Sequence, residues 1–255
     1  MKVLLKFTCT LCLFISCSGN RAIKYLNDLE QANIKGHVTK LITETYEIDS
    51  IGQIIKLESQ TIENFDELGY TITDTTRNFT EKNETVNFLK YNINGSLSSL
   101  ATFENGKKQS EMLLKYDNDK CISMNIYDAN GKLESYYNNI CQTKYGLLSS
   151  LNSYDANGKF LMSYVNEYDS IYQIKATAKD SSGMLKSEVK IHLTDKKYEE
   201  NFIEVSYFKD STDRKNLSYQ YEKWDTAGNW IKKIILDGKG NTIKTVKRIF
   251  NYRLL

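Results

Sequence analysis

The chain has 255 residues, of which 40% are hydrophobic and 26% are charged, with 13 glycines, five cysteines and no proline. This composition is typical of folded globular proteins and excludes a disordered, collagen-like or multi-spanning membrane protein. It has 34 basic and 32 acidic residues, and the two numbers become equal once a leader containing Lys2 and Lys6 is removed. A neutral chain has no bulk attraction for nucleic acid, so no nucleic-acid partner is expected.

The first 16 residues form a predicted export signal. They carry Lys2 and Lys6, then an apolar run from Leu11 to Ile15, and end in the small residue Ser16. Such a segment is too short to span a bilayer and is typical of a signal peptide that is removed.

The end of this segment, Phe14-Ile15-Ser16-Cys17, resembles the lipobox of bacterial lipoproteins. The resemblance implies cleavage before Cys17 and attachment of lipid to its thiol, which makes the membrane a partner, and several acyl chains on one residue anchor a protein stably. The residue after Cys17 is Ser18, and not the Asp associated with inner-membrane retention, so we expect the cell envelope and its outer membrane. An ordinary signal peptide, with Cys17 as one more small apolar residue, is the alternative.

Residues 17–37 are expected to form a lipidated tether with a short helix. Ile23, Leu26 and Leu29 share one side of a helix if residues 21–33 are helical. The remaining residues, 38–255, then form a single domain.

One turn signal recurs through this domain. Nine glycines have Asp or Asn three residues earlier, a spacing that predicts a type I turn followed by a left-handed glycine, which is a three-residue hairpin loop. Gly36 begins the series, and Gly146 lacks such a partner, so we expect it to tolerate a side chain better than Gly131. The turn glycines within the domain are Gly52, Gly69, Gly95, Gly131, Gly158, Gly183, Gly228 and Gly240.

A hairpin of this type places the residue before the Asp or Asn opposite the residue five positions after it. At five turns both residues are apolar, which favours the pairing because cross-strand contacts stabilise a sheet. The five predicted pairs are Ile48/Ile54, Tyr91/Leu97, Tyr127/Leu133, Tyr154/Phe160 and Trp224/Trp230.

These signals predict an all-β fold, an antiparallel meander of repeated hairpins that forms one curved or rolled sheet. Tyr127-Asp-Ala-Asn-Gly-Lys132 and Tyr154-Asp-Ala-Asn-Gly-Lys159 resemble the core of the bacterial YD-repeat, or RHS-like, class of envelope proteins, and residues 219–230 resemble its terminal unit. The resemblance implies architecture and an envelope location but no activity. Whether the sheet stays open or closes into a barrel is left undecided.

Catalytic chemistry is not apparent in the sequence. His37 and His192 are the only histidines, neither has a second ligand at zinc spacing, and no phosphate-binding loop or nucleophile elbow occurs. We therefore expect no catalytic residues, no metal and no cofactor. A hydrolase built from distant strand carboxylates, such as Glu199 or Glu200, remains an alternative and requires two acids with shifted pKa values in one pocket.

Two cysteines remain after processing, Cys121 and Cys141. An exported protein permits a disulfide, and the hairpin register places Cys121 opposite a position near 139, which is close to the second thiol. The bridge is therefore one hypothesis and two free thiols are the other.

Residues 229–255 hold seven basic side chains against one acid, Asp237. Two interpretations are open: a basic surface that meets anionic glycan or lipid head groups, or charges that protect a final edge strand from aggregation.

The repeat and the absent active site favour a lipid-anchored envelope module that binds a ligand, for example a glycan, or another envelope protein, without catalysis. The alternatives are a partner-specific factor, such as an immunity or assembly protein, and the hydrolase above. The sequence does not indicate an oligomeric state.

Overall fold

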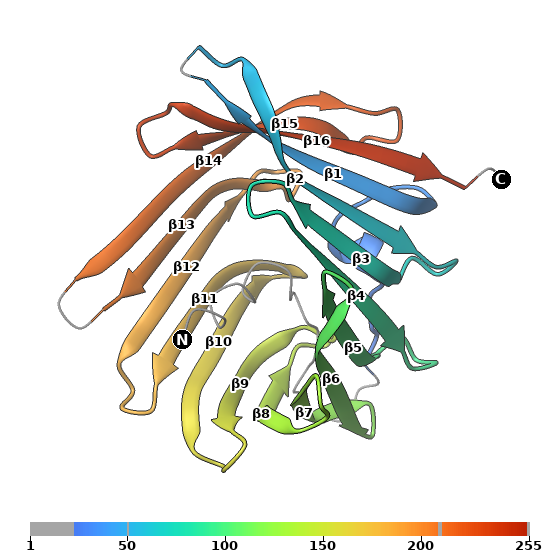
Figure 1. Cartoon of the computed structure of the whole chain (residues 1–255), viewed down its shortest axis with the longest axis vertical. Helices are drawn as coiled ribbons and strands as arrows, with labels where there is room; N and C mark the ends of the chain where they lie inside the picture. The colour runs from blue at the N-terminus through green and yellow to red at the C-terminus, as the bar shows by residue number, and fades with distance from the viewer. Residues whose placement is uncertain (1–22, 50, 209–210, 254–255) are drawn as a thin grey trace.

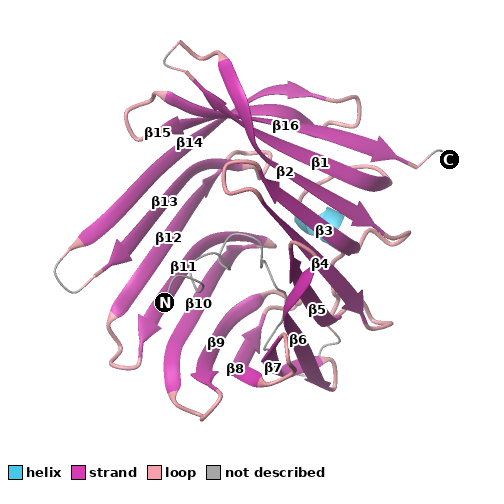
Figure 2. Cartoon of the chain, viewed as in Figure 1, coloured by secondary structure: helices cyan, strands magenta, loops and turns pink. Residues whose placement is uncertain are grey.

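The structure, a computed structural model, describes residues 23–49, 51–208 and 211–253. The predicted signal peptide and Cys17 lie outside these residues. Within these residues, sixteen strands follow one short helix (Figures 1 and 2). The elements are α1 (Asp28–Gln31), β1 (Val38–Ile48), β2 (Ile54–Phe65), β3 (Thr71–Asn78), β4 (Asn83–Tyr91), β5 (Leu97–Glu104), β6 (Lys107–Asp117), β7 (Lys120–Asp128), β8 (Leu133–Gln142), β9 (Leu148–Asp155), β10 (Phe160–Asp169), β11 (Tyr172–Asp180), β12 (Leu185–Leu193), β13 (Glu199–Tyr207), β14 (Thr212–Trp224), β15 (Trp230–Asp237) and β16 (Thr242–Tyr252).

The Asp-x-x-Gly turns form the hairpins that the sequence indicates. At the β7–β8 turn, the Gly131 amide donates to the Asp128 carbonyl at 3.0 Å, and the Asp128 carboxylate accepts from the Asn130 and Lys132 amides at 2.9 and 2.8 Å. All eight turn glycines of the domain have φ between +79° and +87°. Only glycine adopts this conformation without a steric cost.

The predicted cross-strand pairs are confirmed. All five apolar pairs, from Ile48/Ile54 to Trp224/Trp230, stand directly opposite one another in their ladders. Because side chains alternate between the two faces of a strand, these pairs determine which residues of each hairpin face the inside.

Three hairpins use a shorter turn. Asn105-Gly106 joins β5 to β6 and Asn118-Asp119 joins β6 to β7, all four residues with positive φ, and Ser170 has positive φ in the β10–β11 turn. Two-residue turns of this kind match the twist of the strands that they connect. The Asn-Gly pair was a hairpin signal that spacing from an Asp three residues earlier did not detect.

The prediction of one curved or rolled sheet is wrong, because the meander closes into an antiparallel barrel of 16 strands. Figure 1 shows β1, in blue, beside β16, in red. Nine residue pairs join the two strands, and acids of β1 oppose bases of β16: Glu44 faces Lys247 and Glu47 faces Lys244. Opposite charges directly across a ladder stabilise the pairing, and closure removes both edges.

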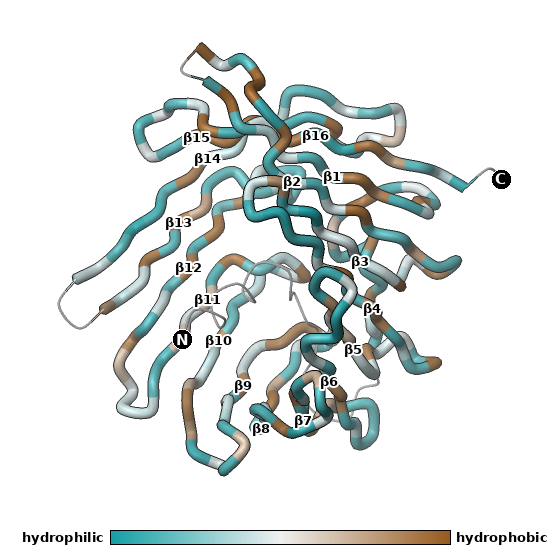
Figure 3. Tube along the Cα trace, in the orientation of Figure 1, coloured by the Kyte–Doolittle hydropathy of each residue, from teal (hydrophilic) through white to brown (hydrophobic). Residues whose placement is uncertain are grey.

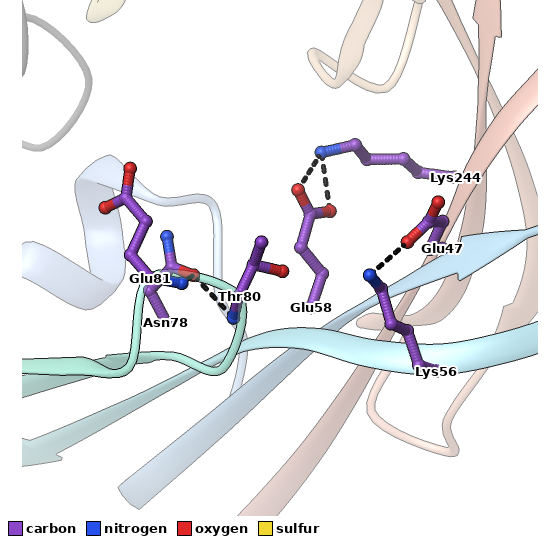
Figure 4. A network of polar contacts seen from close by, with 7 residues as sticks. All are labelled: Glu47, Lys56, Glu58, Asn78, Thr80, Glu81 and Lys244. Carbon is purple, nitrogen blue, oxygen red and sulfur yellow. Dashed lines mark hydrogen bonds and ion pairs between the residues drawn. The ribbon is translucent and has the colours of Figure 1, made fainter.

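The seam is strengthened by a third strand. Lys244 of β16 reaches across β1 to the Glu58 carboxylate at 2.6 Å, while Lys56 of β2 pairs with Glu47 of β1 at 2.9 Å (Figure 4). The basic C-terminal segment therefore does not protect an edge strand. Its Lys244 pairs with Glu58 of β2, its Lys232 with Glu222 of β14, and its Arg253 with Glu67 in the β2–β3 turn.

The helix is shorter than the sequence predicts. Only Asp28–Gln31 are helical, and Asn27 caps this single turn by accepting from the Glu30 amide. A four-residue helix cannot stabilise itself, so packing holds it: Leu29 and Ile34 lie against Val38, Leu41 and Phe65.

The buried side chains concentrate at one end of the barrel. Leu97, Cys121, Leu148 and Trp230 are the first or second residues of β5, β7, β9 and β15, and all are buried. In an antiparallel meander all odd-numbered strands begin at the same end.

Along most strands hydrophobic and hydrophilic residues alternate (Figure 3). Within the described residues, none of the helical structure has the length and apolar character of a membrane span.

Substitutions at two glycines test the turn geometry. The structure reverses the expectation for Gly146: its φ is +84°, and an added Cβ would lie 2.7 Å from Cδ1 of Tyr25, whereas Gly131 has open space around it. We expect Gly131→Val to lower the free energy of unfolding by about 1 to 2 kcal/mol, because the residue resists positive φ. Gly146→Val should cost more, and urea unfolding in which Gly146→Val costs as little or less would contradict this arrangement.

Candidate functional site

Residues 23–37, here called the plug, lie across the end of the barrel at which the odd-numbered strands begin. Tyr25 donates its hydroxyl hydrogen to the Asp119 carbonyl in the β6–β7 turn at 2.6 Å. The side-chain amide of Asn33 donates to the Lys196 carbonyl in the β12–β13 turn at 3.0 Å. The Leu29 amide donates to the Gly69 carbonyl in the β2–β3 turn at 3.3 Å. The plug thus contacts turns from well-separated parts of the rim.

One asparagine holds the end of the plug. Asn229, 2% exposed, accepts from the Lys35 amide and donates to the Lys35 carbonyl, both at 2.8 Å, and its amide also donates to the Tyr252 hydroxyl at 2.8 Å. The Tyr252 hydroxyl in turn donates to Asp225. Asn229 therefore satisfies both backbone groups of Lys35 as a neighbouring strand would.

A buried carboxylate holds the start of the helix. Asp28 accepts from the Thr71 amide at 2.6 Å and from the Tyr91 hydroxyl at 2.8 Å. Burial raises the pKa of Asp28 above its usual value, and these two hydrogen bonds offset part of that effect. The contact joins the plug to β3 and β4.

Two further acids lie on the inner face of the barrel near Asp28. Glu63 of β2 stands opposite Asp74 of β3. Burial raises the pKa of Glu63 to about 7, and the Asp74 charge adds to the effect. Burial also raises the pKa of Asp74, whose carboxylate accepts from Asn87 at 3.5 Å. Glu63 is thus partly protonated at neutral pH.

A cationic and aromatic group occupies the wall on the other side of the seam. The Arg248 guanidinium carbon lies 3.9 Å from the centre of the Trp230 ring, and the Lys233 ammonium lies 4.9 Å from the same centre. Tyr221 and Trp224 pack beside them at ring distances of 5.6 to 5.9 Å. Burial lowers the pKa of Arg248 to about 10, which leaves it charged at neutral pH.

Reasoning from the sequence missed these interior groups. Arg248 was counted only within the basic C-terminal segment, although Val246 and Phe250 flank it at alternate positions. Alternation places all three on one face, and this pattern indicated an inward-facing arginine. No comparable local signal marks Asp28, Glu63 or Asn229, because their partners come from distant strands.

The structure has two of the features that the hydrolase hypothesis requires, a pair of neighbouring acids and raised pKa values for both. Glu63 and Asp74 are neighbouring interior carboxyls with raised pKa values. Glu199 and Glu200, the acids that the sequence suggested, lie on β13 and do not neighbour this pair. A retaining glycosidase also needs one carboxylate that stays ionised as the nucleophile. Burial raises the pKa of Glu63 to about 7 and that of Asp74 above its usual value, and the hydrolase hypothesis stays a prediction.

The other residues considered from the sequence lie apart from this interior set. Cys121 and Cys141 are free thiols; Cys121 stands opposite Tyr116 and Cys141 opposite Ser150. Burial raises the pKa of Cys121 to about 12, which makes its thiol unreactive. Among the described residues, no three His, Cys, Asp or Glu side chains form a group that could hold a metal ion.

No protein-family model matches the chain, and no curated protein matches its sequence. Its fold is similar to that of a porin-like protein from Bacteroides uniformis, at 10% identity and a TM-score of 0.45, over 91% of this chain and 100% of the other. A porin-like protein from Bacteroides vulgatus has 11% identity and a TM-score of 0.30, over 86% of this chain and 100% of the other. The toxin chain TcdB2-TccC3 without its hypervariable C-terminal region has 10% identity and a TM-score of 0.29, over 76% of this chain and 12% of the other. These scores are too low to support a functional argument.

Removal of the Asn229 side chain tests the plug. Asn229→Ala leaves the buried amide and carbonyl of Lys35 without partners, so we expect a loss of about 2 to 4 kcal/mol in the free energy of unfolding and faster proteolysis within residues 23–37. Asn157→Ala, at the exposed tip of the β9–β10 turn, is the matched control. Equal effects of the two substitutions would show that the plug is not held in this way.

The raised pKa of Glu63 predicts a pH dependence. Its carboxyl has a pKa near 4.5 in the unfolded chain and about 7 in the barrel, so the folded state binds the proton more tightly and loses stability as pH rises from 4.5 through 7. Glu63→Gln should therefore be more stable than the native protein at pH 8, by about 1 to 3 kcal/mol, and nearly equal to it at pH 4. Urea unfolding at both pH values measures the difference.

Glu134→Gln, on the exposed surface of β8, is the control for this experiment. A Glu63→Gln variant that is less stable than the native protein at pH 8 would contradict the burial of the Glu63 charge.

Proposed function

We propose that this protein is a non-catalytic binding protein of the bacterial envelope, anchored by lipid on Cys17 and presenting a barrel that its own plug closes on the membrane side. The observation that carries the proposal is the position of the plug. Ile23 begins the described chain at the plugged end, only six residues after Cys17. Six residues span at most about 20 Å, so a lipid on Cys17 holds this end of the barrel close to the bilayer surface.

The outer wall of the barrel supports attachment by lipid over insertion of the wall itself. Ion pairs lie on the face opposite to the interior: Arg77 with Glu84 at 2.7 Å, and Lys175 with Glu167 at 2.9 Å. On β12, Glu188 and Lys190 add a third pair at 3.2 Å. A basic side chain on the lipid face of a membrane barrel costs about 2 to 4 kcal/mol at the bilayer midplane, so this wall suits water.

The interior and the far rim of the barrel support a role in binding. Loop substitutions at the far rim leave the ladders intact, which suits recognition. The inner wall brings charged and aromatic groups together at the seam. In the described residues neither His37 nor His192 has a hydrogen bond to a serine, threonine or cysteine side chain.

Lipidation is tested by expressing the full chain in a bacterial host fed with a labelled fatty acid. The native protein should take up the label and sediment with membranes. Cys17→Ala should lose the label and appear in the soluble or unprocessed fraction, because the acyl acceptor is absent. Cys12→Ala, five residues earlier within the leader, is the matched control and should be labelled as the native protein is.

An unlabelled native protein, or a Cys17→Ala variant that keeps its label, would overturn the anchor. A native protein that stays in the membrane when Cys17 is replaced would favour insertion of the barrel wall.

A further inference from the structure

We propose that the inner wall of the barrel binds a small molecule through an anionic group, a carboxylate or a phosphate ester, at the guanidinium of Arg248. This inference rests on the proposed binding function and is independent of the lipid anchor. It names the chemical class of ligand that the interior accepts.

The position of Arg248 is determined by the barrel seam. It stands opposite Thr43 of β1 on the interior face, and its guanidinium carbon lies 3.9 Å from the centre of the Trp230 ring. Trp230 is 4% exposed, whereas Arg248 retains some accessible surface. The Trp230 ring therefore lies against the guanidinium, while the Arg248 residue as a whole is half-buried.

The guanidinium has no partner that matches its charge. Within the described residues it forms no side-chain hydrogen bond and no ion pair, and its Nε is fully buried without an acceptor. An arginine presents five N–H donors in a planar fork that fits a carboxylate or phosphate. A buried and unpaired donor is costly to leave unsatisfied, and this cost favours an acceptor from a ligand at the guanidinium.

The surrounding charges favour an anion at this position. Lys233 lies 4.9 Å from the same indole centre and 4.5 Å from the ring of Tyr219. The two cations make the electrostatic potential around this ring positive, which favours a negative group nearby. The aromatic side chains of Tyr221 and Trp224 extend the wall beside this position and suit the apolar face of a sugar or another ring.

Glu63 does not take the place of the ligand. It stands opposite Leu41 on β1, two residues along from the partner of Arg248, and feels the Arg248 charge. The two side chains nevertheless form no ion pair. A raised pKa also leaves Glu63 partly protonated at neutral pH, so that it can donate a hydrogen bond to the same ligand.

Tryptophan fluorescence provides a local measurement, because both tryptophans of the chain, Trp224 and Trp230, belong to this wall. The full-length protein in a non-ionic detergent is titrated at pH 7.5 and constant ionic strength with inorganic phosphate, glucose 6-phosphate, galacturonate and neutral galactose. We expect a saturable change and a rise in melting temperature with at least one anionic probe, and a much weaker response to galactose. The phosphate and carboxylate probes distinguish the two sources of the anionic group.

Arg248→Met should bind the anionic probe about tenfold more weakly or worse, because a charge-assisted hydrogen bond is lost. Arg214→Met, an exposed arginine on the outer face of β14, is the matched control and should bind as the native protein does. Arg248→Lys keeps the charge without the fork and should bind with intermediate affinity; it replaces Arg248→Met if circular dichroism shows that the latter does not fold.

Three results would overturn the site: no saturable response to any anionic probe, unchanged affinity in both Arg248 variants, or equal binding of galactose and galacturonate. The last result would remove the anion site and leave the proposed binding function intact.

Discussion

The ladder between β1 and β16 is the interaction on which the rest of the structure depends. Sixteen strands joined by short turns form a ribbon with two edges, and its closure requires that the first and last strands accept each other. Glu44 opposite Lys247 and Glu47 opposite Lys244 make the two edges complementary, and Lys244 extends the contact to Glu58 of β2. Residues about 200 positions apart in the chain are thereby neighbours, and no exposed edge is left for aggregation.

Closure also creates the interior site. Arg248 of β16 is opposite Thr43 of β1, and Glu63 of β2 is opposite Leu41 of β1. A single strand, β1, therefore lies between Arg248 and Glu63. In an open sheet Arg248 and Glu63 would lie at opposite ends of the ribbon, both hydrated. In the barrel they share one enclosed wall, where burial lowers the pKa of the first and raises that of the second. The unpaired guanidinium and the partly protonated carboxyl are consequences of the same seam.

The plug depends on the barrel in the same way. Its four-residue helix is too short to form alone, and the contacts that hold it come from Asn229, Asp119 and Gly69 on separate hairpins. These turns come together only when the barrel is complete. A stable plug therefore reports closure, and the proposed lipid anchor would place this end at the membrane.

The sequence by itself determined the hairpins, because an Asp and a glycine three apart set the turn, and the apolar pair across it sets the register; these are contacts between residues less than ten positions apart. It also contained the basic last strand and the inward alternation of Val246, Arg248 and Phe250. Only the tertiary structure decided that the sheet closes, that the predicted helix over residues 21–33 shrinks to Asp28–Gln31, and that Gly146 lies against Tyr25. Those outcomes depend on contacts between distant segments, whose energies are set by burial and charge after the chain has folded back on itself, and no local spacing encodes them.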